Sequence, residues 1–380
     1  MKIMPYANFY LDQIDCKKHE VHMVYWNRDL KEEDLSKYKD IHLHEFRRYM
    51  EDSIPKYAKI SSFMAYRKFV LPILKEHKFD IIFSLHTMPG IVLIDKLTTK
   101  YDHKYIFDYR DHTFEKITFF RKMIQRIARH AKLVFVSSDA YRQFLPKDDN
   151  IQIISSHNIL ADSLNHRDDR KFKYVKSNKI RLSFWGLIRQ VEHNKNIISR
   201  IANDDRFELH YYGRGQQSEV DLKAFCKSIE AKNVFFHGEY KPEERYDFIN
   251  QTDIIHNNYC DTNSLLAMGN KYYDGIIFRI PQLCMKGSFM GERCNKTGVG
   301  ITLDPKDEDF ADKLYSYYKS IDIDEFNKRC DEDLNNILVS FANIFSHSEG
   351  CLFVFFMVSF AVQKLLSLIK IGRASCRERV

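Results

Sequence analysis

The residues most capable of chemistry in this chain are two cations that follow a glycine. An expected buried strand, residues 180–185, ends at Gly186, and Arg189 and Lys195 come next, with Lys195 at the start of a helical pattern. A glycine at a strand's carboxyl end lets a phosphate approach the backbone, and a helix N-terminus offers free N–H groups and partial positive charge. Two flexible cations could then clamp a diphosphate. The plainer alternative is a pair of solvated cations near a helix start.

A second polar pair stands on an expected helix further along the chain. Lys271 lies one helical turn before Asp274, so the two side chains can face the same ligand or pair with each other. A carboxylate of this kind could accept both hydroxyls of a ribose through charge-assisted hydrogen bonds. The alternative for Asp274 is an ordinary acid on the surface of its helix.

Candidate residues also follow two expected strands in the first half. His86 ends the strand at 79–86, before a glycine-containing turn, and Asp108, Arg110 and Asp111 end the next strand. Charges are costly to bury unpaired, so we expect Arg110 to pair with one aspartate. The other aspartate could position an acceptor hydroxyl. A hydrogen-bonded histidine at the sheet's end, and an ion pair without catalytic duty, are the alternatives.

The elements that must position these residues alternate between strand and helix, and short apolar runs predict strands buried on both faces of parallel sheets. In the first half we expect strands at 19–26, 41–46, 79–86, 104–109, 132–137 and 151–155, and helices at 5–16, 61–77, 89–100, 119–130 and 139–145. In the second half we expect strands at 180–185, 207–212, 234–237, 253–257, 281–285 and 300–303, and helices at 195–203, 219–231, 242–250, 266–277 and 309–320. The predicted fold class is therefore α/β, with two doubly wound, Rossmann-like domains that bind ligands at strand carboxyl ends.

Composition fits a two-domain cytoplasmic enzyme. The 380 residues are 44% hydrophobic and 29% charged, which is about right for two cores. The net charge of +7 is scattered, a pattern that suits an anionic substrate or an acidic membrane surface and argues against nucleic acid. The eight cysteines form no Cys-x-x-Cys pair, so we expect reduced thiols and neither a disulfide framework nor a zinc site. The opening residues are not those of a signal peptide.

Residues 4–335 resemble GT-B-fold glycosyltransferases of the family 4 type, close to bacterial enzymes of capsule and surface-polysaccharide assembly. In that family an arginine and a lysine after the first strand of the C-terminal domain bind the donor diphosphate, and they match Arg189 and Lys195. The second member of the family's acidic pair matches Asp274, whereas Leu266 occupies the first position. The resemblance implies two domains that face each other across a cleft holding the active site.

The reaction that the resemblance implies is transfer of a sugar from a nucleotide diphosphate sugar to a saccharide or lipid-linked acceptor. It implies retention at the anomeric carbon, no metal and no cofactor, and it is compatible with peripheral contact at the inner face of the plasma membrane. His86 and Asp111 are then the acceptor-side candidates. On the donor side, Arg189 and Lys195 are expected to bind the diphosphate, with help from main-chain N–H groups near Gly186 and around Asn263 and Ser264. Asp274 would hold the ribose, Lys271 could face the same cleft as a further substrate-binding residue, and Tyr240 would border the base.

Two other classes of function compete with this interpretation. A sugar-nucleotide epimerase with a similar cleft would need acid–base carboxylates and histidines in both halves. A non-catalytic relative that binds a nucleotide or glycan is favoured by Leu266 and by the start of the chain, where a glycine-rich first strand is missing or reduced to residues 1–3.

The sequence also predicts the division of the chain. We expect an N-terminal acceptor-side domain at 1–165, with a charged linker at 161–177, and a C-terminal nucleotide-sugar domain at 166–345. The apolar tail at 346–370 is too short to span a bilayer in its most hydrophobic part, residues 351–362. A frame-shifted read, a buried helix and a membrane-surface segment are the alternatives for this tail. Residues 371–380 match the translation of a widely used sequencing-library adaptor, and we expect them to be foreign to the fold.

Overall fold

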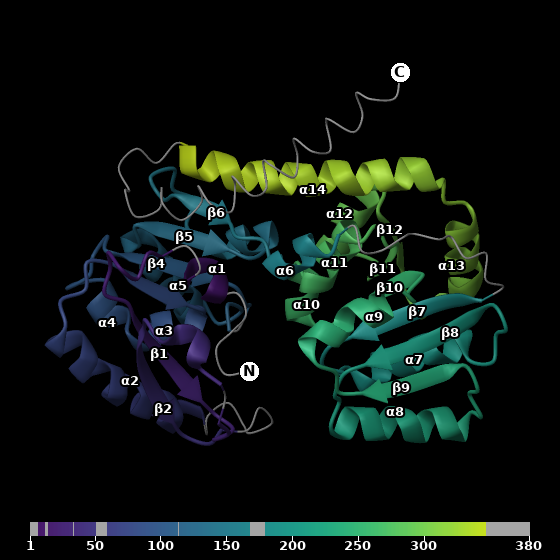
Figure 1. Cartoon of the computed structure of the whole chain (residues 1–380), viewed down its shortest axis with the longest axis horizontal. Coiled ribbons are helices and arrows are strands. Elements are labelled where there is room, and N and C mark those ends of the chain that lie inside the picture. Colours follow the sequence, from purple (N-terminus) through teal and green to yellow (C-terminus); the bar gives the residue numbers. More distant parts are fainter. Residues whose placement is uncertain are drawn as a thin grey trace. The chain divides into compact units, whose positions relative to one another are not determined.

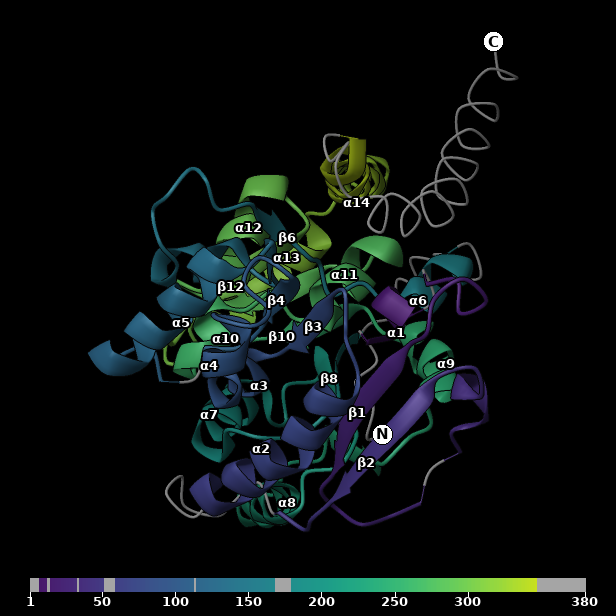
Figure 2. The same cartoon turned by 90° about the vertical axis from the view of Figure 1, so that its left-hand side faces the viewer.

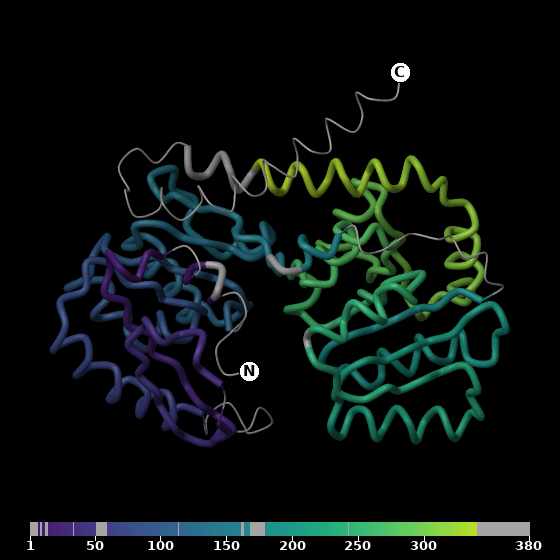
Figure 3. Tube along the Cα trace, in the orientation of Figure 1, coloured from purple at the N-terminus to yellow at the C-terminus, as the bar shows by residue number. Residues whose placement is uncertain are grey.

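The structure is a computed structural model that describes residues 7–11, 14–32, 34–50, 59–112, 114–167 and 179–346 (Figures 1 and 3). The chain divides into two compact units. Unit 1 comprises Met1–Ser156 with Leu338–Val380, and unit 2 comprises His157–Ile337. The boundary that we placed at 165/166 lies a few residues beyond this division. Residue 346 is the last one described, so the rest of the tail predicted at 346–370, the adaptor-like segment 371–380 and residues 1–3 lie outside the described residues.

Unit 2 holds one continuous parallel sheet with the strand order β12-β11-β10-β7-β8-β9. The strands are β7 (Ile180–Trp185), β8 (Phe207–Tyr212), β9 (Val234–Gly238), β10 (Ile254–Asn257), β11 (Gln282–Met285) and β12 (Gly300–Leu303). The helices are α6 (Ala161–Asn165), α7 (Val191–Ile201), α8 (Gln217–Ser228), η4 (Pro242–Glu244), α9 (Arg245–Ile249), α10 (Thr262–Leu266), α11 (Asn270–Ile277), α12 (Phe289–Thr297), α13 (Phe310–Lys319) and α14 (Ile323–Ser346), whose last residues pass into unit 1.

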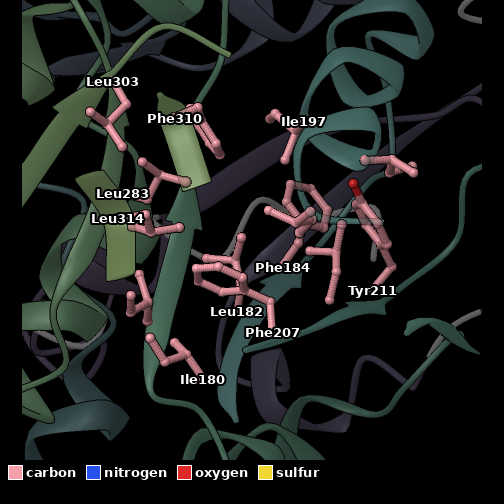
Figure 4. Close-up of a cluster of buried hydrophobic side chains, with 14 of the residues drawn as sticks. Ile180, Leu182, Phe184, Ile197, Phe207, Tyr211, Leu283, Leu303, Phe310 and Leu314 are labelled. Carbon is pink, nitrogen blue, oxygen red and sulfur yellow. The ribbon is translucent and has the colours of Figure 1, made fainter. Parts of the chain in front are cut away.

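The main core of unit 2 lies on one face of this sheet (Figure 4). Along β8, every second residue is fully buried because alternate side chains of a strand point to the same face. Helices α7, α8 and α13 cover that face with apolar side chains. Burying each leucine, isoleucine or phenylalanine contributes about 1.5–3 kcal/mol. The core residues drawn in Figure 4 include Leu182, Phe184, Ile197, Phe207, Tyr211, Leu283, Phe310 and Leu314.

The opposite face of the same sheet is covered by α9 and α11. The Trp185 ring packs against that of Phe248 on α9, with 5.6 Å between the ring centroids. Helix α11 comes close to β11 because Gly275 has no side chain, since a Cβ at this position would overlap the Gln282 amide. Helices on both faces make this a doubly wound layer, as predicted.

Unit 1 contains two separate parallel sheets, one with strands β1-β2 and one with the order β3-β4-β5-β6. The strands are β1 (His22–Asn27), β2 (His42–Arg47), β3 (Ile82–Leu85), β4 (Tyr105–Tyr109), β5 (Leu133–Val136) and β6 (Ile153–Ser155). The helices are α1 (Ala7–Leu11), η1 (Ser36–Tyr38), α2 (Lys59–Glu76), α3 (Thr87–Val92), α4 (Ile94–Leu97), α5 (Thr118–His130) and η3 (Asp139–Phe144). Figure 2 shows β1 and β2 side by side, in the parallel register that pairs His22 with His42.

Side chains connect the elements of unit 1. The β4 residues are all buried, as are those of β5, which fits central strands covered on both faces. Arg67 on α2 makes two hydrogen bonds to Asp95 on α4, at 2.6 and 2.8 Å, and so ties these helices together. Near β1, the buried residues Ala7 and Tyr25 share a small apolar cluster with Leu85 of β3.

The predicted fold class is confirmed, and each predicted strand is present within a few residues. Among the helices, the one expected at 266–277 is divided into α10 and α11 around Ala267–Gly269, and the one at 89–100 into α3 and α4. Helices α12 and α14 and the short helix η1 were not predicted, and α6 lies where the sequence predicted the start of a charged linker at 161–177. None of the helices described is both long and apolar enough to cross a membrane.

Candidate functional site

Two glycine turns meet at the carboxyl edge of the unit 2 sheet. Gly186, which follows β7, has φ +123°, and Gly213, which follows β8, has φ +130°. These values lie in a region that side chains disfavour. A Cβ at Gly213 would also overlap the carbonyl oxygen of Gly186. The Gly186 N–H donates to the Tyr212 carbonyl at 2.9 Å, so the two turns form a compact stretch of backbone without side chains.

The chain reverses its direction across the sheet next to this point. It leaves β7 toward β8 and β9, then returns to β10 on the other side of β7. Ligands of open parallel sheets bind at such a switch point, beyond the carboxyl ends of the strands. Gln190, which has φ 59°, connects the two loops: its Oε1 accepts from the Cys260 N–H at 3.0 Å, and its Nε2 donates to Asp261.

Lys271, in the first turn of α11, brings an ammonium to the Gly186 turn. Its Nζ lies 3.6 Å from the place that a Cβ of Gly186 would occupy, and 4.6 Å from the centroid of the Phe184 ring. Burial lowers the pKa of Lys271 to about 8, with Asp274 opposing the shift and Arg189 adding to it. Among the described residues, no carboxylate forms an ion pair with Lys271. The pairing of Lys271 with Asp274 that the sequence allowed is therefore not formed.

Arg189 and Lys195, the two cations predicted to clamp a diphosphate, lie in different surroundings. Arg189 is exposed at the turn and close enough to Lys271 to lower the pKa of that ammonium. Helix α7 begins at Val191, so Lys195 lies in its second turn rather than at its start. The Lys195 ammonium lies 2.7 Å from Glu192 and 5.7 Å from the ring centroid of Phe225 on α8. The structure therefore gathers Arg189 and Lys271 at the glycine turns.

Asn263 and Ser264 lie in the short helix α10, whose first N–H groups are partly capped. Asp261 is the N-cap residue, and its Oδ1 accepts from the Ser264 N–H at 3.0 Å. The Ser264 hydroxyl donates to the same carboxylate at 2.5 Å. Capping of this kind satisfies donors that would otherwise be available to a ligand. The Asp261 carboxylate thus accepts hydrogen bonds both from Ser264 and from Gln190, which lies next to the β7 turn.

Asp274 is enclosed in unit 2. Its Oδ1 accepts from the Ser163 hydroxyl at 3.3 Å, and its Oδ2 accepts from the Trp185 indole N–H at 3.2 Å. Arg245, which was not singled out from the sequence, places a guanidinium nitrogen 3.9 Å from Oδ2. Burial raises the pKa of Asp274, while Arg245, Trp185 and Lys271 counteract the shift. Tyr240 packs edge-on against Phe248, with ring centroids 5.0 Å apart.

Arg245 is the main residue that sequence reasoning missed. It begins α9, is largely buried, and donates to the Ser163 hydroxyl at 2.7 Å. Its local sequence, Pro-Glu-Glu-Arg-Tyr, has the composition of an exposed helix start. The local sequence signal for a buried arginine was its aromatic neighbour, Tyr246. In the structure the guanidinium lies over the Tyr246 ring, 5.2 Å from its centroid.

In unit 1 the structure brings His86 and Asp111 together. They follow the neighbouring strands β3 and β4, and Nδ1 of His86 lies 2.9 Å from Oδ2 of Asp111. His86 has φ 77° and ψ 159°, a region in which a residue other than glycine costs about 1–3 kcal/mol. Its N–H donates to the Asp108 carbonyl at 3.0 Å, and Thr87 donates to the Asp111 carbonyl at 3.2 Å. A partly exposed, strained histidine held by a carboxylate is typical of a functional position.

The prediction that Arg110 pairs with one aspartate is confirmed. Its Nε donates to Asp108 at 2.6 Å, and both side chains are almost completely buried. The Tyr10 hydroxyl donates to the same carboxylate at 3.0 Å, and Arg110 also reaches the Ser156 hydroxyl at 2.8 Å. Burial opposes the charge of Arg110, but Asp108 and the other partners raise its pKa on balance. This group is internal, which leaves Asp111 as the carboxylate that faces His86.

No family model and no curated protein matches the chain. Solved structures do resemble it. HepE of Anabaena, in complex with UDP and glucose, matches with a TM-score of 0.53 and 12% identity, over 79% of this chain and 88% of that one. Sucrose-phosphate synthase from Thermosynechococcus elongatus matches with a TM-score of 0.60 and 11% identity, over 82% and 84%. A glycosyltransferase from Rickettsia africae matches with a TM-score of 0.57 and 15% identity, over 88% and 86%. The chain therefore has the GT-B glycosyltransferase fold.

Proposed function

We propose that the protein is a glycosyltransferase that uses a nucleotide diphosphate sugar. The observation that carries this proposal is the group at the carboxyl edge of β7: two glycine turns, the exposed guanidinium of Arg189, and the Lys271 ammonium, which has no ion-pair partner among the described residues. Bare backbone and two cations suit a diphosphate. The HepE structure with the same fold contains UDP and glucose, which supports this choice of ligand.

The diphosphate would lie between Arg189 and Lys271, against the N–H groups near Gly186. In the reaction, the bond between the anomeric carbon and the diphosphate oxygen breaks, and a bond from that carbon to the acceptor hydroxyl oxygen forms. Negative charge grows on the leaving diphosphate, and preorganised cations stabilise that charge in the transition state. An anion beside Lys271 would also offset the burial that lowers the pKa of this lysine.

The acceptor side would use His86 and Asp111 of unit 1. The 2.9 Å contact between Nδ1 and the carboxylate fixes the ring of His86, which would contact the transferred sugar. The acceptor hydroxyl loses its proton as the new bond forms, and a positioned carboxylate such as Asp111 can assist that step. Retention without a metal, a saccharide or lipid-linked acceptor, and a role in surface-polysaccharide synthesis remain part of the proposal through the family 4 resemblance.

In this proposal Asp274 binds the ribose and also holds neighbouring side chains of unit 2 in place. Both of its oxygens already accept protein hydrogen bonds, from Ser163 and Trp185. A ribose could replace the Ser163 hydroxyl at Oδ1, whose 3.3 Å contact is the longer of the two. Asp274 would then hold the ribose while it keeps Arg245 and Trp185 in place, and Tyr240 would border the base.

The proposal is tested by comparing four lysine and arginine variants in unit 2. Calorimetry with UDP, GDP and ADP identifies the base that binds best. With that nucleotide, Arg189→Ala and Lys271→Ala should each weaken binding by about 10–100-fold, because a hydrogen bond to a charged group is worth roughly 1.5–3 kcal/mol. Lys195→Ala should change the affinity by less than about 5-fold, since its ammonium forms a surface pair with Glu192. Lys223→Ala, which removes an exposed lysine from α8, is the matched control.

Turnover of the matching labelled nucleotide sugars completes this test. His86→Ala should slow release of the nucleoside diphosphate while leaving nucleotide affinity unchanged, because His86 belongs to the other unit. Unchanged nucleotide affinity in both Arg189→Ala and Lys271→Ala would rule out the proposed clamp.

A non-catalytic nucleotide-binding protein is the second candidate. It is favoured by Leu266, which stands where the family has an acid, and by the enclosure of Asp274. In this case the four variants would affect nucleotide binding as described, and no nucleotide sugar would be turned over. Full turnover by the wild-type protein would exclude this candidate.

A further inference from the structure

Unit 1 contains a histidine cluster that the proposed transfer reaction does not use. Its members are Glu20, which precedes β1, His22 at the start of β1, His42 and His44 at the start of β2, and His77, which follows α2. Glu20, His22, His42 and His44 lie at or near the amino ends of these strands, and the His77 ring lies beside that of His22. His86 and Asp111 follow the carboxyl ends of β3 and β4.

The strand register places the histidines on one face. His22 pairs directly with His42 on the neighbouring strand, and the two rings stack with 4.7 Å between their centroids. His44 lies two residues beyond His42, so it points to the same face, because alternate residues of a strand share a side. His77 reaches this face from the end of α2, with its ring centroid 4.2 Å from that of His22. The cluster thus follows from the sheet register.

The donor atoms of three residues converge. His22 Nε2 lies 2.9 Å from Glu20 Oε1, and His42 Nε2 lies 3.7 Å from the same oxygen. Two imidazole nitrogens and a carboxylate oxygen are ligands that Zn²⁺ prefers, at about 2.0–2.2 Å from the metal. Ligands at that distance in a tetrahedral arrangement are separated by roughly 3.3 Å, so the observed spacings lie on either side of the required value. We propose that Glu20, His22 and His42 form a binding site for a divalent transition metal such as Zn²⁺.

The surroundings of His22 support this assignment. Its other ring nitrogen, Nδ1, lies 2.9 Å from Nε2 of His44. A histidine that binds a metal generally donates its second N–H to a neighbouring acceptor, which fixes the ring and the tautomer. The C-terminus of α2 beside His77 adds partial negative charge, which favours a bound cation.

The three proposed ligands differ in how far their side chains are exposed to solvent. The side chain of His22 is only 6% exposed, whereas those of Glu20 and His42 are 66% and 62% exposed. A metal would therefore have one anchored ligand and two that close from the surface. Because it would connect the start of β1 to that of β2, it would stabilise the two-stranded sheet and take no part in sugar transfer.

The test measures zinc affinity of the full chain, without an affinity tag, by competition with a chromophoric chelator. The wild-type protein should bind one Zn²⁺, and Co²⁺ at the same site should give the visible bands of nitrogen and oxygen ligands without thiolate bands. His42→Ala and Glu20→Gln change exposed side chains and should each lower the affinity at least about 10-fold. His44→Ala should lower it about 10–100-fold while one metal still binds. His103→Ala removes an exposed histidine from another histidine–aspartate group and is the control.

Three outcomes would overturn the proposal: no zinc uptake at equimolar concentration, equal affinity in all four variants, or thiolate bands in the cobalt spectrum. Nucleotide affinity should be the same in His42→Ala and the wild-type protein, since that site belongs to unit 2. Failure of the metal site is therefore distinguishable from failure of the proposed transfer function.

Discussion

The two units build parallel sheets in different ways. In unit 2, β7 has a paired strand on each side, and six strands form one ladder. In unit 1, the strands are divided between a pair, β1-β2, and a set of four that begins with β3. Among the described residues no strand pairs with the second edge of β3. Backbone hydrogen bonds therefore unify the unit 2 sheet, whereas the contacts seen between the two sheets within the described residues of unit 1 are made by side chains such as Tyr25 and Leu85.

This difference shows where each unit gains its cohesion. In unit 1, Tyr10 of α1 bonds to Asp108 in β4, and Arg110 bonds to Ser156 after β6, so buried polar side chains connect distant elements. A sheet edge without a partner leaves backbone groups to be satisfied by water. Unit 2 also has a buried polar network, around Asp274, but its six strands form one continuous sheet and its main core packs on one face of that sheet.

The largest expected effect comes from removing the buried arginine of each unit. Arg110→Ala should lower the free energy of unfolding of unit 1 by about 3–5 kcal/mol, because Asp108 stays buried without its charged partner and with only the Tyr10 hydroxyl still donating to it. Arg245→Ala should cost unit 2 only about 1–3 kcal/mol, since Trp185 and Ser163 still donate to Asp274.

The chain offers a direct measurement, because its two tryptophans lie in different units. Urea unfolding followed by fluorescence would report unit 1 through Trp26 in a Trp185→Phe background, and unit 2 through Trp185 in a Trp26→Phe background. Equal losses in the two units would contradict the view that unit 1 depends more on its polar network.

A second expected difference concerns hydrogen exchange. Amides in β7 should exchange at least about 100-fold more slowly than those in β3, because exchange from a central strand requires unfolding of a larger cooperative region. Mass spectrometry of peptides that cover Ile82–Leu85 and Ile180–Trp185 would measure this. Equal protection of β3 and β7 would show that the second edge of β3 is covered in solution.

The smallest expected effect is a pH dependence confined to unit 2. The pKa of Lys271 is about 8 in the free protein, and a bound anion should raise it. As the pH rises above about 8, the free protein loses the Lys271 proton while the complex keeps it, so affinity for a nucleoside diphosphate should fall by about 10-fold per pH unit. Lys271→Arg keeps its charge and should show no such fall in calorimetry. A wild-type affinity that stays constant to pH 9.5 would contradict the assigned pKa.

The described strands and one contact of the candidate site could be predicted from the sequence. Apolar runs identify buried parallel strands, and residues at the carboxyl ends of neighbouring strands come together, which is why the sequence placed His86 and Asp111 in one group. The pairing of Arg110 with an aspartate followed from the cost of burying charge. These inferences use local pattern and general electrostatics.

The remaining features depend on contacts between distant segments. Lys271 reaches the Gly186 turn because Gly275 lets α11 lie close to β11. Asp274 is enclosed because Ser163, more than a hundred residues earlier, donates to it. The start of α7 at Val191 moved Lys195 away from the position that its spacing after Gly186 predicted. No periodicity in a single segment contains such information.

The contact between the glycine turns has a mechanical consequence. Gly213 rests on the carbonyl of Gly186, and its N–H donates to the Gly238 carbonyl at 2.6 Å. The ends of β7, β8 and β9 are thus linked in series through backbone alone, without a flexible side chain in between. We therefore expect a displacement of the first turn to reach the third turn, which precedes Tyr240, because each turn is bonded directly to the next.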